Sequence, residues 1–167
     1  KMFDGCPGCP YPAYKAFYDY YGQFDYANQW VLAAFDGKET NFKMGNADFS
    51  RYGFTGRTEA VKKGTAYMAV YMYVIREFYD AIDDCQSGCI NCNDDPVHAW
   101  DEGVAFYTGS KEDSLLYTLG DKRCANFMTC GTTVDNSDIE GTAKVNYDIW
   151  AEFPQGKSNL NTRNCAA

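Results

Sequence analysis

The stretch that decides the fold runs from residue 58 to residue 84 and reads TEAVKKGTAYMAVYMYVIREFYDAIDD. Its apolar residues recur at steps of three and four, which is the period of an α-helix. The opposite side of this helix also carries apolar residues, among them Tyr67, Val70 and Phe78. A helix that is apolar all round is one that protein surrounds. The stretch therefore predicts a long central helix over about residues 58–84.

Shorter runs with helical spacing flank this stretch on both sides. Asp95-Pro96 is typical of a helix start, because aspartate caps the first turn and proline is tolerated there. Between the runs, residues 37–57 contain four glycines and no steady period, which predicts an ordered loop held by its aromatic rings. The expected shorter helices cover residues 12–21, 24–35, 95–109, 113–129 and about 145–153, the last ending by Pro154 because proline breaks a helix.

No stretch alternates in the manner of a half-buried strand. We therefore expect an all-α fold: a disulfide-stapled bundle of five or six helices around the 58–84 helix, with ordered Cys/Gly-rich loops. A chain of 167 residues can bury one core, so we expect a single helical domain over residues 1–167.

The cysteines are even in number and lie in loop-like contexts rich in Gly, Pro and Asn. Such a pattern predicts disulfide bonds and an oxidising compartment, so we expect the chain to be secreted. The spacing does not assign the pairing. The eight residues are Cys6, Cys9, Cys85, Cys89, Cys92, Cys124, Cys130 and Cys165.

Two other roles for the cysteines are weaker. Cys6 and Cys9 have CxxC spacing, as do Cys89 and Cys92, and four thiolates could bind zinc. The separation of about 80 residues exceeds the usual spacing of such sites. A redox role for Cys6 and Cys9 would need a βαβ context, whereas the residues that follow predict a helix.

The formal net charge of −8 limits the partners of this chain. A negative surface repels phosphate backbones and anionic lipid, so we expect no nucleic-acid binding. No apolar run approaches the roughly 20 residues that span a bilayer, so we expect no membrane insertion. The sequence has no Asn-x-Ser/Thr acceptor, which leaves O-linked glycan as the form of glycosylation it allows.

Candidate metal ligands fall at two places. Asp80, Asp83 and Asp84 crowd the end of the predicted central helix, while Lys62 and Lys63 fall in its first turns, against the preference of the helix dipole. Either a basic partner, for which Lys122 and Arg123 are the candidates, or a cation bound among these acids and the nearby Asp94 and Asp95 could offset this arrangement.

The second place is one helical turn that carries His98, Asp101 and Glu102. Residues three and four apart share a helix face, so these side chains form a partial metal-binding face. With phenolate oxygen from one or more of the 14 tyrosines, they could hold Fe³⁺. The alternative to metal binding is that the acids are solvated or ion-paired at the surface and that His98 is a capping or core residue.

The sequence lacks the parts of common active sites. It has one histidine, no Gly-x-Ser-x-Gly elbow and no glycine-rich phosphate loop. Carboxylate pairs such as Glu77 with Asp101 occur by chance in an acidic protein. We therefore expect that the chain is not an enzyme, has no catalytic residues and needs no cofactor.

Three segments resemble secreted proteins of algae and related protists. They are KKGTAYM at residues 62–68 with VIREF at 74–78, WDEGVAFYTGS at 100–110, and DKRCANF at 121–127. These segments are similar to the low-iron-inducible periplasmic protein family, and the resemblance covers about residues 12–165. It implies a helical extracellular, periplasmic or cell-surface domain, which can be one unit of a longer chain, with a role in iron assimilation. It supplies no ligand set.

Two functional hypotheses follow. The first is a non-enzymatic structural module of an algal or protist cell surface that packs against copies of itself in a fibre or wall layer. The second is an extracellular iron-binding protein that uses the metal candidates above.

Overall fold

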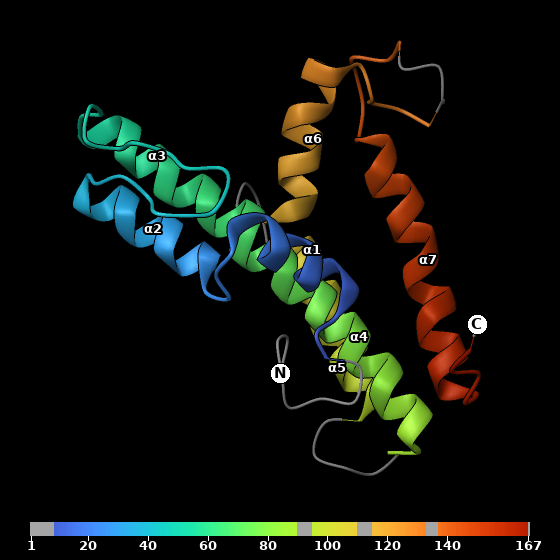
Figure 1. Ribbon diagram of the computed structural model, residues 1–167. Coiled ribbons are helices and arrows are strands. Elements are labelled where there is room, and N and C mark those ends of the chain that lie inside the picture. Colours follow the sequence, from blue (N-terminus) through green and yellow to red (C-terminus); the bar gives the residue numbers. More distant parts are fainter. Residues whose placement is uncertain (1–8, 90–94, 110–114, 133–136, 167) are drawn as a thin grey trace. The chain divides into compact units, whose positions relative to one another are not determined.

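The computed structural model describes residues 9–89, 95–109, 115–132 and 137–166 (Figure 1). Within these residues the regular structure is helical, and the only extended pairings are three isolated bridges. This confirms the all-α, disulfide-stapled fold. The helices are α1 (Pro12–Tyr21), α2 (Tyr26–Asp36), α3 (Phe54–Gly64), the π-helical segment η1 (Thr65–Val70), α4 (Tyr71–Ser87), α5 (Pro96–Thr108), α6 (Leu116–Phe127) and α7 (Lys144–Asn161).

The predicted central helix is longer than expected. α3, η1 and α4 follow one another without a break, since Gly64, Thr65 and Tyr71 all have right-handed helical backbone angles. The continuous helix therefore covers residues 54–87 and not 58–84. The glycines near its start indicated a loop, but Gly53 serves as the residue before the first turn. With this helix counted once, the described residues form six helices.

Protein does not surround this helix as predicted. Tyr67, Tyr71 and Tyr73 are 39–42% exposed. Tyrosine tolerates such positions because its ring packs on apolar neighbours while its hydroxyl reaches water. An apolar side made of tyrosines is therefore weak evidence of burial.

The chain divides into two compact units, Lys1–Arg76 and Glu77–Ala167, which we call the N-terminal and C-terminal units. The division falls inside α4. The prediction of a single domain is not tested by this division and stays a prediction.

In the N-terminal unit, α2 packs along α3 (Figure 1). Gly22 and Gly37 end α1 and α2 in left-handed conformations that glycine adopts without strain. The loop after Gly37 is ordered as predicted, because Phe42 and Phe49 are buried and Phe49 packs edge-on against Trp30.

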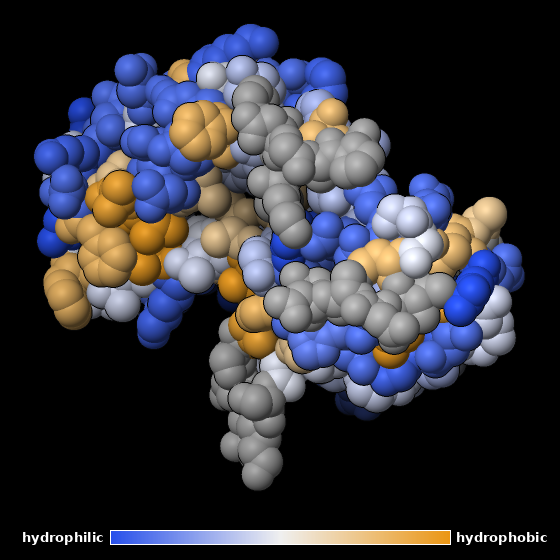
Figure 2. All heavy atoms as spheres, turned by 90° about the horizontal axis from the view of Figure 1, so that it is seen from below, coloured by the Kyte–Doolittle hydropathy of each residue, from blue (hydrophilic) through white to orange (hydrophobic). Residues whose placement is uncertain are grey.

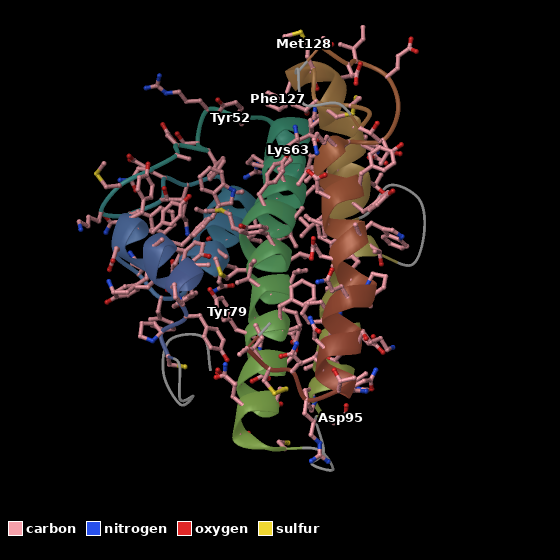
Figure 3. The ribbon with its side chains drawn as sticks, turned by 90° about the vertical axis from the view of Figure 1, so that its right-hand side faces the viewer. Tyr52, Lys63, Tyr79, Asp95, Phe127 and Met128 are labelled. Atoms are coloured by element: carbon pink, nitrogen blue, oxygen red, sulfur yellow. A yellow bond between two sulfur atoms is a disulfide. The ribbon has the colours of Figure 1, made fainter. Side chains whose placement is uncertain are left out.

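In the C-terminal unit, α5, α6 and α7 pack on one another. Asp95 begins α5 and accepts hydrogen bonds from the backbone N–H groups of Val97 and His98, which confirms the predicted cap (Figure 3). The end of α4 joins this unit through Phe78, whose ring centroid lies 4.7 Å from that of Trp100.

The prediction that α7 ends by Pro154 is wrong, because the helix continues to Asn161. Packing beyond the proline offsets its cost of about 3 kcal/mol. The indole of Trp100 lies against Gly156, where a Cβ atom would be 2.0 Å from the ring, and its Nε1 donates to the carbonyl of Phe153. One turn further on, Leu160 is buried against Ala81 and Ala99.

The end of α6 also differs slightly from the prediction. The helix ends at Phe127, and Met128 follows its last turn in a left-handed conformation; Gly131, which was expected to end the helix, is also left-handed but lies three residues further on. The disulfide bond Cys124–Cys130 closes a short loop here, and the N–H of Thr129 donates back to the carbonyl of Cys124. The closed loop leaves no room for another helical turn.

A second disulfide bond, Cys85–Cys165, joins the end of α4 to the residues after α7. Cys9 and Cys89 are also disulfide-bonded. A zinc site needs thiolates, so the zinc alternative that used these two residues is wrong. Cys6 and Cys92 lie outside the described residues.

Candidate functional site

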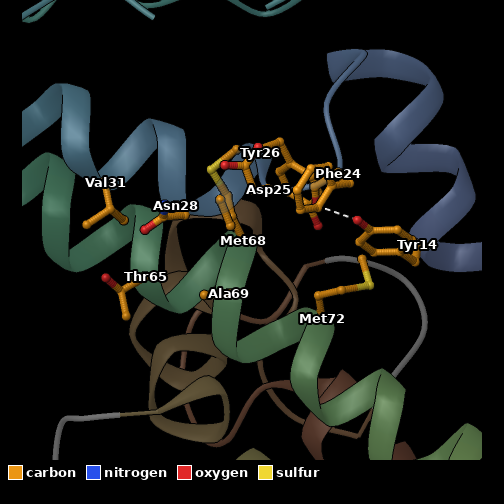
Figure 4. Close-up of a pocket in the computed structure, with 11 residues that line it drawn as sticks. Tyr14, Phe24, Asp25, Tyr26, Asn28, Val31, Thr65, Met68, Ala69 and Met72 are labelled. Atoms are coloured by element: carbon orange, nitrogen blue, oxygen red, sulfur yellow. Dashed lines mark hydrogen bonds between the residues drawn. The ribbon is translucent and has the colours of Figure 1, made fainter. Parts of the chain in front are cut away.

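A pocket of about 420 Å³ opens on the N-terminal unit between α1, α2 and the long helix (Figure 4). Volumes on the order of 300–1,000 Å³ are typical of small-molecule sites. Its walls are mainly apolar. The lining residues are Tyr14, Phe24, Asp25, Tyr26, Ala27, Asn28, Val31, Thr65, Met68, Ala69 and Met72.

One wall is the turn between α1 and α2, which aromatic packing holds in place. The ring of Tyr26 stacks on that of Tyr21 at a centroid distance of 4.9 Å and on that of Phe17 at 5.5 Å. The hydroxyl of Tyr14 donates a hydrogen bond to the carbonyl of Phe24, across the turn. These contacts hold Phe24 and Tyr26 in place, and with them Asp25, which lies between the two in sequence and lines the pocket.

The opposite wall is the π-helical segment. Thr65, Met68 and Ala69 come from η1, and Met72 comes from the first turn of α4 (Figure 4). A π-helical turn shifts the side chains after it relative to a regular helix. Such turns are rare in proteins as a whole, and those that do occur are often found at functional sites. Methionine side chains are flexible and polarisable, so this wall can adapt to more than one shape.

Of the described residues that line the pocket, one has a charged side chain, Asp25. Its carboxylate accepts a hydrogen bond of 2.8 Å from the amide of Gln29. No lysine, arginine or histidine of the described residues forms an ion pair with it. Burial, and after it the negative charge of Asp25, raises the pKa of the Tyr14 hydroxyl. The carboxylate of Asp25 is thus close to Tyr14, which lines the same pocket.

Tyr26 is 2% exposed, and its hydroxyl has no hydrogen-bond partner among the described residues. Burial raises the pKa of this hydroxyl. A buried hydroxyl without a partner costs about 1–3 kcal/mol. The packing of the ring therefore has to offset that cost.

A second feature of the N-terminal unit is an apolar surface where α2 ends and α3 begins. We call it the α2–α3 tip and define it as Leu32, Phe35, Tyr52 and Phe54, which are 49–80% exposed. Arg57 joins the two helix ends, since its Nη1 donates to the carbonyl of Phe35 at 3.3 Å. Apolar side chains gather in this part of the surface, on the left of Figure 2.

The C-terminal unit has exposed apolar side chains of its own. Phe127 and Met128 lie at the end of α6 and are 68% and 52% exposed (Figure 3). We call this pair the α6 tip. Apolar groups exposed together mark interaction surfaces more often than single ones do.

The structure brings together only part of the predicted His98, Asp101 and Glu102 face. Nε2 of His98 lies 3.2 Å from a carboxylate oxygen of Glu102. Asp101 instead accepts two hydrogen bonds, of 2.9 and 2.6 Å, from the ammonium group of Lys157 on α7. One of the two carboxylates of the predicted face, that of Asp101, is therefore engaged by a lysine.

The acids at the end of α4 are also engaged. Asp80 is buried, and each of Asp80, Asp83 and Asp84 makes an interaction within the structure. In the described part of the chain, no three His, Cys, Asp or Glu side chains form a group that could hold a metal ion. Asp94, a further acid near this site in sequence, lies outside that part. The iron hypothesis stays a prediction without a supporting ligand group.

The predicted charge conflict at the start of the central helix is absent. The helix begins at Phe54, so Lys62 and Lys63 lie in its third turn and not in its first. Their ammonium groups are 3.6 and 3.5 Å from the carboxylate of Glu59, one turn earlier. The dipole argument failed because the start of the helix was placed four residues too late.

Sequence reasoning missed the pocket and both tips. The pocket depends on the contact of α1 and α2 with η1 and α4, which come much later in the chain, and no motif marks these elements. One signal was present: an aspartate between two aromatic residues, Phe24-Asp25-Tyr26, at the start of a predicted helix.

Among the described helices, none combines the length and the apolar character needed to cross a membrane.

Comparison of the chain with protein-family models, with characterised proteins and with solved structures gives no match.

Proposed function

We propose that this protein is a non-enzymatic extracellular structural module that associates with copies of itself. The observation that carries the proposal is the α2–α3 tip, with Phe35 63% and Phe54 80% exposed. Aromatic side chains are enriched in the cores of protein interfaces, where burying them releases water from a large apolar area. Leaving such rings exposed is unfavourable unless something covers them.

The disulfide bonds support a location outside the cytosol. All six cysteines of the described residues are disulfide-bonded, and such bonds persist in secreted, periplasmic and cell-surface proteins. Cross-links also suit a load-bearing module, because they limit how far the chain can extend when it is pulled.

The partner that we propose for the α2–α3 tip is a second copy of the chain. The net charge of −8 disfavours nucleic acid and anionic membranes. The tip residues Leu32, Phe35, Tyr52 and Phe54 are uncharged, so two tips can meet without burying ions. Tip-to-tip contact alone would give a closed dimer, whereas contact of the α2–α3 tip with the α6 tip of another copy would extend into a fibre.

Sedimentation velocity and negative-stain electron microscopy over a concentration series test this proposal. We expect assemblies that grow with protein concentration and with added salt, since salt screens the repulsion between acidic copies. The double variant Phe35→Ser/Phe54→Ser should lose them. Tyr67→Ser is the matched control, because it also removes an exposed ring of the N-terminal unit, but outside the tip.

Two outcomes would reject the proposal. One is a wild-type protein that stays monomeric at high concentration and high salt. The other is a double variant that assembles as well as the wild type. A double variant that forms dimers while the wild type forms fibres would assign extension to the α2–α3 tip and dimerisation to another surface.

A further inference from the structure

The pocket has a chemical character that the proposed structural role does not use. It combines apolar walls with one carboxylate, that of Asp25, which has no cationic partner in the described residues. Asp25 is the residue before the first turn of α2, where the positive end of the helix dipole favours a negative charge. Its carboxylate lines the pocket.

We propose that this pocket binds an organic cation with an apolar tail, such as an alkylammonium compound. The cationic group would pair with the carboxylate of Asp25, next to the rings of Tyr14 and Phe24. Aromatic faces attract ammonium groups, and this attraction grows when the site excludes water. The inference does not depend on self-association.

The apolar tail would lie along the π-helical wall. Met68 and Met72 provide flexible thioether side chains there, and Val31 provides an apolar contact from α2. A volume of about 420 Å³ is larger than a small ammonium head group needs, so the head group alone would leave much of the pocket unfilled.

The sign of the ligand charge follows from two independent features. Among the described residues, Asp25 is the only charged one that lines the pocket, and the whole chain carries a net charge of −8. Both attract cations and repel anions. A neutral ligand with the same tail would gain the apolar contacts but not the charge pair.

Three ligands with the same tail and different head groups separate these contributions: octyltrimethylammonium, octanol and octyl sulfate. We expect titration calorimetry below their micelle-forming concentrations to show the cation binding on the order of tenfold more tightly than octanol, with octyl sulfate weakest. Equal binding of the cation and octanol, or no binding of the cation, would overturn the proposal.

Asp25→Asn tests the role of the carboxylate, and asparagine keeps the capping preference of aspartate at a helix start. We expect this variant to bind the cation on the order of tenfold more weakly and octanol unchanged. Asp36→Asn is the matched control, since it removes one negative charge from the same helix at a residue that does not line this pocket. An equal effect of both variants would show that only net charge matters and would overturn the proposal.

Ala69→Phe tests the location, because it places a ring in the pocket from an exposed position on η1. It should abolish binding of the cation and of octanol, whereas Ala151→Phe, at an exposed position of α7, should not. Circular dichroism checks that each variant is folded. Retained binding in a folded Ala69→Phe variant would place the ligand elsewhere and reject this site.

Discussion

The hydroxyl of Tyr107 donates a hydrogen bond of 2.6 Å to the side-chain oxygen of Asn146. The amide nitrogen of Asn146 donates in turn to the carbonyl of Tyr117 and to the carboxylate of Asp121. Asn146 is fully buried between α5, α6 and α7. One amide thus links all three helices of the C-terminal unit by satisfied hydrogen bonds.

We expect Asn146→Ala to lower the free energy of unfolding by about 2–4 kcal/mol, because it leaves buried partners without hydrogen bonds. Urea denaturation followed by circular dichroism measures the change. Gln155→Ala, at an exposed position of the same helix, should change stability by less than about 0.5 kcal/mol. Equal losses in both variants would mean that the amide is not the link.

Two of the buried tyrosines, Tyr26 and Tyr107, should respond in opposite ways to loss of the hydroxyl. Tyr26→Phe removes a buried hydroxyl without a described partner, so the unfolding free energy should rise by about 1 kcal/mol or stay unchanged. Tyr107→Phe removes the donor to Asn146 and should lower it by about 1–2 kcal/mol. Thermal and urea unfolding of both variants give the comparison. A large loss for Tyr26→Phe would reveal a partner for its hydroxyl.

Alkaline pH should destabilise the protein partly through Tyr107. Burial, and then the negative charge of Asp121, raises the pKa of Tyr107 from its ordinary value near 10 to about 12. Between these values the unfolded chain releases this proton while the folded chain keeps it, so stability falls as pH rises. The contribution of Tyr107 to the free energy of unfolding is therefore fully present below about pH 10 and is lost as the pH rises toward 12.

The slope from this group should approach about 1.4 kcal/mol per pH unit between pH 10 and 12. Urea unfolding at a series of pH values measures it, and Tyr107→Phe should make the dependence shallower. Tyr147→Phe is the control, because Tyr147 is 43% exposed. An identical pH dependence in wild type and Tyr107→Phe would contradict the raised pKa.

The two described disulfide bonds should differ in their contribution to stability. Cys85–Cys165 joins residues 80 apart in sequence, whereas Cys124–Cys130 joins residues six apart. Because a longer closed loop removes more entropy from the unfolded chain, the losses should be about 4–5 and about 2 kcal/mol. Replacing each pair by serine and comparing urea midpoints tests the order. The opposite order would show that local packing, and not loop closure, dominates.

The sequence predicted what local physics determines. Helical period located every helix of the described residues, and short signals located several ends, such as the cap at Asp95 and the glycine after α2. These signals work because the few residues next to them set the backbone conformation. The proline at position 154 failed as a signal, because contacts of Trp100 and Leu160 from outside the local stretch override it.

The candidate site could not be predicted for a related reason. Periodicity identified Phe35 as apolar but could not tell that its ring is exposed, since exposure depends on what packs beside it. The π-helical turn at residues 65–70 has no sequence signal, yet it forms one wall of the pocket. The predicted metal face at His98 followed from helical spacing, but spacing could not foresee that Lys157 would engage Asp101.

The bond between Cys85 and Cys165 has a consequence for how the protein would respond to proteases. A single cleavage anywhere between these two residues would leave both fragments covalently joined, with α5, α6 and α7 still attached to the end of α4. Such nicked molecules would keep the mass of the intact chain, apart from one added water, and would separate only after treatment with a reducing agent.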